Sequence, residues 1–140
     1  METFLSGCTA DGELVASGKC NQATHGVSFN EIAKLFAIAY AWNGNETYLA
    51  ASTNAFEMIA QYDTQVHGAN SGDECLNGIG PNAATETCDI VDYSYANEWM
   101  LRVTGDARYA DRIERAMYNA APAAVNRAFT EHVYFQAPNY

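Results

Sequence analysis

Two stretches of the sequence decide the fold, and they match each other at a fixed offset. The first is residues 28–48, SFNEIAKLFAIAYAWNGNETY, and the second is residues 89–109, DIVDYSYANEWMLRVTGDARY. Gly44 and Gly105 are 61 positions apart (105 minus 44), as are Tyr48 and Tyr109. The same offset relates the apolar pairs Phe29/Ile90, Ile32/Tyr93, Ile38/Trp99, Ala39/Met100, Trp42/Val103, Leu49/Ala110 and Phe56/Met117. The sequence therefore predicts two copies of a helix, a glycine-containing turn and a second helix.

The first copy predicts a buried helix followed by a half-buried one. Ser28 and Glu31 fit a capping box, so the first helix should run from about Ser28 to Trp42. Its large apolar residues form two stripes, which are Phe29, Ile32, Phe36 and Tyr40, and Leu35, Ile38 and Trp42. A helix that is apolar on two faces belongs inside a structure. The second helix, about Glu46 to Gln61, has fewer large apolar residues and should lie outside.

The second copy repeats this alternation. A helix from about Ile90 to Val103 is rich in aromatic and aliphatic residues and should be another inner helix. Gly105 should end it in the left-handed conformation, and Asp106 should cap the next helix, about Ala107 to Ala120, which Pro122 stops. In that helix we expect Tyr109, Ile113, Met117 and Ala120 to face the core and Asp111, Arg112 and Arg115 to face water.

The predicted fold class is all-α, built from αα-hairpin repeats. Stacked repeats of this kind need about three or more units to cover an inner layer. The 140 residues provide about two hairpins and an intervening loop, so we expect one part of a larger helical array, with exposed apolar helix faces that favour self-association. Residues 1–19 have no assignment.

Composition excludes several classes of function. Hydrophobic content of 49% against 17% charged residues is typical of a globular chain. A net charge of −10 repels a phosphate backbone, so we expect no nucleic acid and no anionic membrane as partner. No apolar run approaches the roughly 20 residues of a membrane helix, and the start of the chain shows no signal peptide.

The repeat also predicts where chemistry would lie. His25 and Glu86 differ by the same 61 positions, and each comes just before an inner helix. Equivalent helix ends point toward one mouth, so His25, Glu86 and Cys88 should converge there. Glu74 lies in a Gly/Asn-rich loop, Gly68 to Pro81, that could bring a general acid to the same mouth. A carboxylate and a thiol two residues apart are possible zinc ligands, although two ligands do not complete a tetrahedral site.

Each of these residues also has a purely structural interpretation. Glu74 could be a solvated loop residue, and His25 a histidine whose hydrogen bonds only support the fold. Glu86 could simply be an acid at a helix start beside a buried cysteine, or Cys88 could form a disulfide with Cys75. Cys8 and Cys20 could be buried thiols or a disulfide, and we assign them no role.

A series of short motifs, taken in order, resembles the catalytic domain of the β-L-arabinofuranosidase family, glycoside hydrolase family 127 and its relatives. The resemblance covers about residue 20 to the end of the chain. It is carried by His25-Gly26-Val27, Ser71-Gly72-Asp73-Glu74, Glu86-Thr87-Cys88, Thr104-Gly105-Asp106, Tyr109-Ala110-Asp111, Glu114-Arg115-Ala116-Met117-Tyr118-Asn119 and Tyr134 in Val133-Tyr134-Phe135-Gln136-Ala137-Pro138-Asn139.

The resemblance implies an (α/α)₆ toroid and a retaining glycosidase. In the family a zinc-bound cysteine thiolate attacks the anomeric carbon and forms a thioglycosyl intermediate, while a glutamate protonates the leaving oxygen and later activates water. By position, Glu74 resembles the acid/base, and Glu86 and Cys88 resemble two zinc ligands. His25, Glu114 and Tyr134 resemble residues that hold the L-arabinofuranoside.

One departure from the family pattern limits this expectation. The family's nucleophile and another zinc ligand are adjacent cysteines downstream of the tyrosine, whereas this chain has no cysteine after Cys88. We therefore expect the 140 residues alone to be inactive and to bind zinc weakly or not at all. Two alternatives stay open: a non-catalytic helical-repeat binding module, and another α/α-toroid sugar enzyme such as an unsaturated glucuronyl hydrolase or an epimerase.

Overall fold

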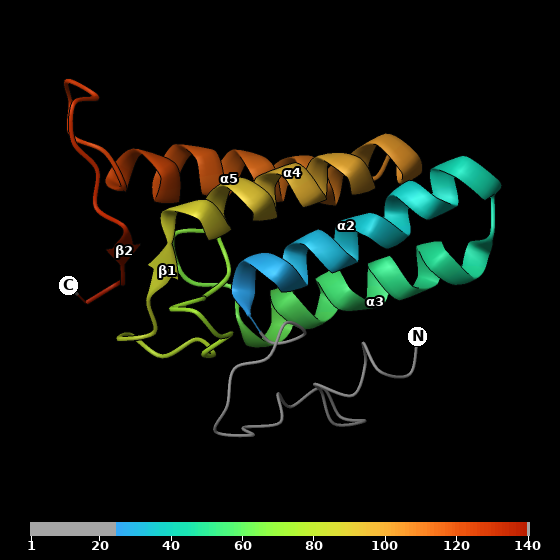
Figure 1. The fold of residues 1–140 in the computed structure, drawn as a ribbon, viewed down its shortest axis with the longest axis horizontal. Helices are drawn as coiled ribbons and strands as arrows, with labels where there is room; N and C mark the ends of the chain where they lie inside the picture. The colour runs from blue at the N-terminus through green and yellow to red at the C-terminus, as the bar shows by residue number, and fades with distance from the viewer. Residues whose placement is uncertain (1–24, 140) are drawn as a thin grey trace.

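A computed structural model describes residues 25–139, which form two αα-hairpins and one small antiparallel sheet (Figure 1). The unassigned residues 1–19, with Cys8 and Cys20, lie outside the described residues. The elements are α2 (Gly26–Asn43), α3 (Glu46–Tyr62), β1 (Thr85–Glu86), α4 (Thr87–Thr104), α5 (Ala107–Ala123) and β2 (Phe135–Gln136). The mainly helical fold predicted from the sequence is confirmed.

The offset of 61 positions is also confirmed, and it holds for both ends of every helix. Helix α4 begins and ends 61 positions after α2, and α5 begins and ends 61 positions after α3. The first helix of each hairpin, α2 or α4, ends at a glycine with φ of 68°, Gly44 or Gly105. This left-handed conformation costs glycine little, which is why the two turns have the same form.

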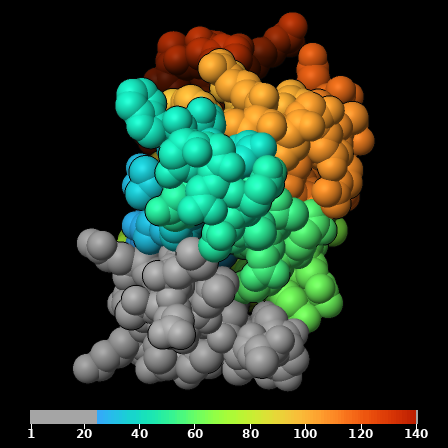
Figure 2. Space-filling view, turned by 90° about the vertical axis from the view of Figure 1, so that its right-hand side faces the viewer, coloured from blue at the N-terminus to red at the C-terminus, as the bar shows by residue number. Residues whose placement is uncertain are grey.

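The helices pack as two hairpins whose first helices lie side by side. Helix α2 packs against α4, α3 packs against α2, and α5 packs against α4. In Figure 1, α2 and α4 begin at the same end of the molecule and run in the same direction, while α3 and α5 return. Figure 2 looks at the opposite end, where the α2–α3 turn (cyan) lies beside the start of α5 (orange). The shared starting end of α2 and α4 is the predicted mouth.

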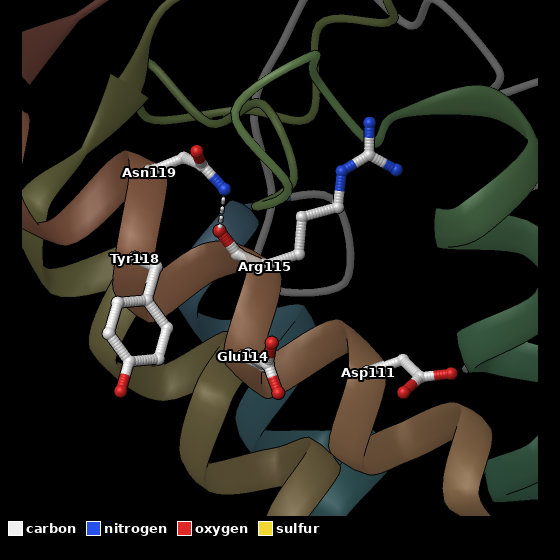
Figure 3. Close-up of a pocket in the computed structure, with 5 residues that line it drawn as sticks. All are labelled: Asp111, Glu114, Arg115, Tyr118 and Asn119. Carbon is white, nitrogen blue, oxygen red and sulfur yellow. Dashed lines mark hydrogen bonds between the residues drawn. The ribbon is translucent and has the colours of Figure 1, made fainter.

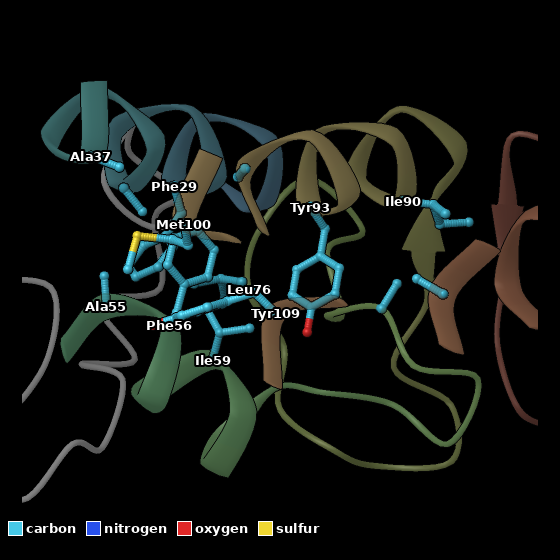
Figure 4. Packing of buried hydrophobic residues seen from close by; sticks show 14 of the residues in the cluster. Phe29, Ala37, Ala55, Phe56, Ile59, Leu76, Ile90, Tyr93, Met100 and Tyr109 are labelled. Atoms are coloured by element: carbon cyan, nitrogen blue, oxygen red, sulfur yellow. The ribbon is translucent and has the colours of Figure 1, made fainter. Parts of the chain in front are cut away.

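The core lies where the four helices meet (Figure 4). Phe56 of α3 and Tyr109 of α5 meet edge to face, with ring centroids 6.1 Å apart. Outside this contact, Glu57 of α3 pairs with Arg108 at 3.1 Å and with Arg112 at 3.0 Å. Burial of each large apolar side chain contributes about 1.5–3 kcal/mol, so the core stabilises the bundle far more than these partly exposed ion pairs.

The buried stripe of α2 differs from the prediction. Phe29, Ala33 and Ala37 are buried, whereas Leu35 and Trp42 are 59% and 91% exposed. Small alanines at the contact allow α2 and α4 to approach closely, which the count of large apolar residues could not reveal. The face of α2 that carries Leu35 and Trp42 is therefore not covered by residues 25–139, and self-association through it stays a prediction.

Three predicted helix boundaries were wrong, and one of them is the start of α4, which lies at Thr87 and not at about Ile90. His25, and not Ser28, is the N-cap of α2, and its Nδ1 accepts a hydrogen bond from the Ser28 N–H at 3.3 Å. Helix α5 continues through Pro122 to Ala123, because a proline in the last turn removes only one backbone donor. Near this end the Gln136 side chain donates to the carbonyl of Ala120 at 3.0 Å.

The predicted orientation of α5 was correct only in part. Tyr109 and Ala120 are buried as expected, but Met117 is 46% exposed and Ala116 takes the core position. Arg112 is not fully in water, since its side chain is only 17% exposed and its guanidinium lies 5.3 Å from the Tyr109 ring centroid. Across residues 25–139, no helix combines the length and the apolar character that a membrane crossing requires.

Candidate functional site

Three segments meet at the end of the molecule where α2 and α4 begin. The loop between α3 and β1 is tied to α2 by the Gly26 N–H, which donates to the Glu74 carbonyl at 2.9 Å. Strand β2 pairs with β1 in the register Thr85–Gln136 and Glu86–Phe135. The Thr87 N–H also donates to the Tyr134 carbonyl at 2.9 Å. We call His25, Glu74, Glu86, Cys88 and Tyr134 the candidate site.

His25 and Glu74 are in direct contact. Nε2 of His25 lies 3.4 Å from Oε2 of Glu74, with side chains 29% and 68% exposed. The other ring nitrogen, Nδ1, accepts from the Ser28 N–H, so the ring is held on both sides. Glu74 has a φ of 71°, a conformation that non-glycine residues rarely adopt and that is concentrated at functional sites. Glu74 is therefore oriented, although it lacks the burial expected of an acid/base.

Glu86 occupies the N-cap of α4 but does not cap the helix. Its side chain accepts no hydrogen bond from a backbone N–H of the first turn, unlike His25 in α2 or Asp106 in α5. The residue is only 2% exposed, and its Oε1 has no hydrogen-bond partner. A buried carboxylate oxygen without a partner is costly, which points to a ligand at this position.

Cys88 joins Glu86 to Tyr134. Its Sγ lies 3.6 Å from Oε2 of Glu86 and 3.3 Å from Oη of Tyr134. Burial raises the pKa of the Cys88 thiol, and the Glu86 carboxylate raises that pKa further. The contact with Cys88 and the charges of Cys88, Glu86 and Glu74 raise the pKa of Tyr134 to about 12. Both groups thus keep their protons at neutral pH unless a cation is bound.

Cys88 is a free cysteine, whereas Cys75 is disulfide-bonded. The alternative of a Cys75–Cys88 disulfide was therefore wrong, and the thiol remains available as a ligand. The Cys88 thiol therefore lies beside Glu86 and Tyr134, and its role as a metal ligand stays a prediction.

Glu114 does not join the candidate site. It lies on α5 and lines a shallow depression of about 290 Å³ together with Asp111, Arg115, Tyr118 and Asn119 (Figure 3). No hydrogen bond or ion pair among residues 25–139 links Glu114 to the other five predicted residues. Its sugar-binding role stays a prediction.

The geometry of Glu86 and Cys88 fits a shared zinc ion. Zinc–sulfur and zinc–oxygen bonds of about 2.3 and 2.1 Å, at a tetrahedral angle, separate the two ligand atoms by about 3.6 Å. The observed separation of Oε2 and Sγ is 3.6 Å. Among residues 25–139 there is no group of three or more His, Cys, Asp or Glu side chains that could hold a metal ion. The pair is therefore not a complete metal site within these residues.

The sequence analysis missed a polar cluster directly behind the candidate site. Asn30, Asn70 and Asp89 are each 0% exposed and are hydrogen-bonded to one another. The available signal was Asn30, a polar residue on the same helix face as Ala33 and Ala37. The analysis of hydrophobic periodicity takes only apolar residues into account, so it did not identify Asn30 as part of the buried face.

The arrangement combines the parts needed for acid–base chemistry on a small polar substrate. One carboxylate is exposed and oriented by an imidazole, and a second is buried beside a thiol and a phenol. The exposed carboxylate of Glu74 can exchange a proton with a substrate. The buried carboxylate of Glu86 and the thiol of Cys88 are groups that can bind a cation.

Comparisons with known proteins give a consistent picture of the fold. A GH127 β-L-arabinofuranosidase from Geobacillus Stearothermophilus T6, Ara127N-Se, is similar over 81% of this chain with a TM-score of 0.75 and 22% identity. A sugar epimerase from a ruminal bacterium is similar over 82% of this chain, with a TM-score of 0.70 and 16% identity. The chain spans 19% of the first structure and 29% of the second. Among curated proteins, no sequence matches.

The family is shown by a match along nearly the whole chain. The model described as β-L-arabinofuranosidase, GH127 catalytic domain, matches residues 17–139, which include all six residues predicted for the site. The chain therefore belongs to the family of GH127 β-L-arabinofuranosidase catalytic domains.

Proposed function

We propose that this chain supplies the acid/base and part of the zinc site of a retaining glycosidase that releases β-L-arabinofuranose. The observation that carries the proposal is the convergence of Glu74, Glu86 and Cys88, with His25 and Tyr134, at one end of the bundle. These residues come from four separate segments of the chain, and their meeting at one end of the bundle supports the roles that the family resemblance implies for them. The match to the GH127 catalytic domain supports the same substrate class.

Glu74 is the proposed general acid and base. Its carboxyl would donate a proton to the glycosidic oxygen while the nucleophile of the complete domain bonds to the anomeric carbon, so the electron pair of the breaking C–O bond would leave with a neutral alcohol. In the second half-reaction the carboxylate would take a proton from the water that attacks the anomeric carbon, and the bond from that carbon to the nucleophile would break with its electron pair going to the nucleophile. His25, 3.4 Å away, holds the carboxyl in position for both transfers.

Glu86 and Cys88 are the proposed zinc ligands from this chain. The unpartnered Oε1 of Glu86 and the 3.6 Å separation of Oε2 from Sγ support this assignment. Zinc removes the proton of a coordinated thiol, which otherwise stays bound in the surroundings of Cys88. The nucleophilic cysteine of the family is not among these residues, because the sequence has no cysteine after Cys88.

The remaining site residues are proposed to bind the sugar. The phenol of Tyr134 contacts Cys88 and the imidazole of His25 contacts Glu74, and both groups can form hydrogen bonds to sugar hydroxyl groups. Glu114 is proposed to contribute through the (α/α)₆ toroid, of which this chain would form two hairpins. The exposed apolar side chains of Leu35 and Trp42 on α2 and of Val91 on α4 would then be covered by neighbouring hairpins. The exposed Glu74 would become enclosed and thus better suited to proton transfer.

The experiment that tests this function is Glu74→Gln in the full-length protein that carries this chain. An aryl β-L-arabinofuranoside with a good leaving group needs little acid assistance, whereas an alkyl arabinofuranoside needs much. We expect kcat/KM to fall by roughly 10² or more for the alkyl substrate and much less for the aryl substrate.

The matched control is Asp73→Asn, the neighbouring exposed acid, which should leave both substrates nearly unaffected. Unchanged activity of Glu74→Gln on the alkyl substrate would reject the acid/base role and favour a non-catalytic binding module. Sugar epimerisation without bound zinc would favour the other toroid enzymes.

A further inference from the structure

Asp89 follows Cys88 directly, but its carboxylate is hydrogen-bonded to Asn30 and Asn70 and not to the candidate site. It belongs to the first turn of α4, is 0% exposed, and occupies the junction of α2, α4 and the loop before β1. The position equivalent to Asp89 in the first hairpin is Ser28, which instead contacts the N-cap His25. The two helix starts therefore differ at the residue next to the candidate site.

Two asparagines hold the Asp89 carboxylate. Nδ2 of Asn30, on α2, donates to Oδ1 at 2.7 Å. Nδ2 of Asn70, in the loop, donates to Oδ1 at 3.1 Å and to Oδ2 at 2.9 Å. Asn30 also donates to Oδ1 of Asn70 at 3.0 Å, which closes the cluster. The three side chains therefore connect α2, the loop and α4 through one buried network.

The backbones of two glycines, Gly26 and Gly72, lie close to the same carboxylate. A Cβ atom on Gly26 would lie 2.8 Å from Oδ2 of Asp89, and one on Gly72 would lie 2.3 Å from it. Both distances are shorter than side-chain packing allows, and neither glycine has a positive φ that would explain it. These glycines are therefore required by the close approach of their backbones to Asp89.

The two glycine backbones carry the candidate site. The Gly26 N–H donates to the Glu74 carbonyl at 2.9 Å, and Gly26 is bonded to His25. The Gly72 carbonyl accepts from the Glu86 N–H at 3.1 Å, and the Gly72 N–H donates to the Ala84 carbonyl at 2.8 Å. Each of the residues His25, Glu74, Glu86 and Cys88 is thus one peptide or hydrogen bond from Gly26, Gly72 or Asp89.

We propose that Asp89, held by Asn30 and Asn70, is a positioning residue that sets the geometry of the candidate site through the backbones of Gly26 and Gly72. The Asp89 carboxylate is hydrogen-bonded to Asn30 and Asn70 and not to the candidate site, so its side chain acts only through the backbone segments that it holds. The effect on catalysis rests on the proposed glycosidase function, whereas the claim that Asp89 holds the backbones of Gly26 and Gly72 in place does not. A displacement of about 1 Å at reacting groups can cost 10² in rate, so a small shift of either backbone would be measurable.

The test is Asp89→Asn in the full-length protein, with Ser52→Ala as the matched control. The amide keeps the shape of the carboxyl but places a donor against the asparagine amides. Ser52 is equally buried, and its hydroxyl donates to the Ala33 carbonyl at 2.6 Å and lies 3.0 Å from Sδ of Met100, both outside the candidate site. Both variants lose a buried hydrogen bond, so both should lower the melting temperature.

Two further measurements separate positioning from general stability. The first is amide hydrogen exchange of Gly26 and Glu86, relative to the helix-end amides of Gly44 and Gly105. We expect Asp89→Asn to raise the exchange rates of the Gly26 and Glu86 amides by roughly tenfold or more relative to those of the Gly44 and Gly105 amides. Ser52→Ala should leave this ratio of exchange rates unchanged. The second is a fall in kcat of roughly tenfold or more, with KM nearly unchanged, in Asp89→Asn alone.

Each outcome decides the matter. Equal exchange of both amide pairs in Asp89→Asn, or faster exchange with unaltered kcat, overturns the proposal. A wild-type protein without glycosidase activity defeats the proposed function, whereas the exchange ratio still decides whether Asp89 holds the two backbones. Where Asp89→Asn does not fold, Asn30→Ala replaces it, because this change removes one donor to the Asp89 carboxylate without crowding it, and the same exchange criterion applies.

Discussion

Glu86 shows how a single residue departs from the repeat. At the equivalent position in the first hairpin, His25 accepts a hydrogen bond from the first turn of its helix, but Glu86 leaves the first turn of α4 without a side-chain cap. A missing cap costs about 1 kcal/mol, and burial of a carboxylate oxygen without a partner adds to that cost. Residues that break local rules in this way are expected at functional sites.

A second buried acid, Asp63, gives a prediction about stability and pH. Burial raises the pKa of Asp63 from its ordinary value of 3.8 to about 6, although hydrogen bonds from Gly78 and Ser71 oppose the shift. The folded state therefore binds this proton more tightly than the unfolded state, and ionised Asp63 lowers the stability as the pH rises from about 4 through 6. We expect the free energy of unfolding of Asp63→Asn, relative to that of wild type, to increase over this pH range, by on the order of 2 kcal/mol above pH 7.

Urea denaturation from pH 4 to pH 8 measures this difference. Asp111→Asn, at an exposed position on α5, is the control and should track wild type. A stability difference between Asp63→Asn and wild type that does not vary with pH would show that desolvation of Asp63 is not the cause.

The turn between the two helices of each hairpin gives a prediction for the elements. Gly44 and Gly105 both have φ of 68°, and a Cβ at either position would meet nothing within 4 Å. Alanine at these positions should therefore cost only the left-handed backbone penalty, roughly 1 kcal/mol each. Since the two turns are at separate positions, the double variant should show the sum of the two costs.

The control for these substitutions is Gly80→Ala. A Cβ there also meets nothing within 4 Å, but the backbone does not have a positive φ. Thermal unfolding should leave Gly80→Ala close to wild type. Equal losses in all three alanine variants would mean that the conformation of the turns is not what selects glycine.

The helices and turns were largely predictable from the sequence because they repeat. Two independent copies of one pattern support each other, so the 61-position offset located every helix to within about three residues or fewer. The N-cap His25 was missed because histidine rarely caps, and Ser28 with Glu31 imitated a capping box. The pairing of β1 with β2 was missed because two-residue strands leave no periodicity to read.

The site was predictable in part for the same reason. The convergence of His25, Glu86 and Cys88 followed from equivalent helix ends, and the contacts of Glu74 and Tyr134 with them agree with the family resemblance. The Asp89 cluster could not be predicted, since it depends on a long-range contact between α2, a loop and α4. Apolar patterns do not specify which buried polar residues meet.

At the scale of the whole molecule, residues 25–139 provide one end of a site and not its enclosure. Glu74 is 68% exposed, and Leu35, Trp42 and Val91 expose apolar surface on α2 and α4. The chain spans 19% of the GH127 structure to which it is similar. We infer that further hairpins cover these helix faces in the assembled catalytic domain, which would make the surroundings of the site less polar.

The most direct test of the central claim is the zinc content of the full-length protein that carries this chain, measured after dialysis in wild type, Glu86→Gln and Cys88→Ser. The account predicts about one zinc per wild-type chain and a loss of affinity of roughly 10-fold or more in each variant, with Glu98→Gln as a control that retains the metal. Zinc content that is unchanged in both Glu86→Gln and Cys88→Ser would contradict the claim that these two residues hold the metal.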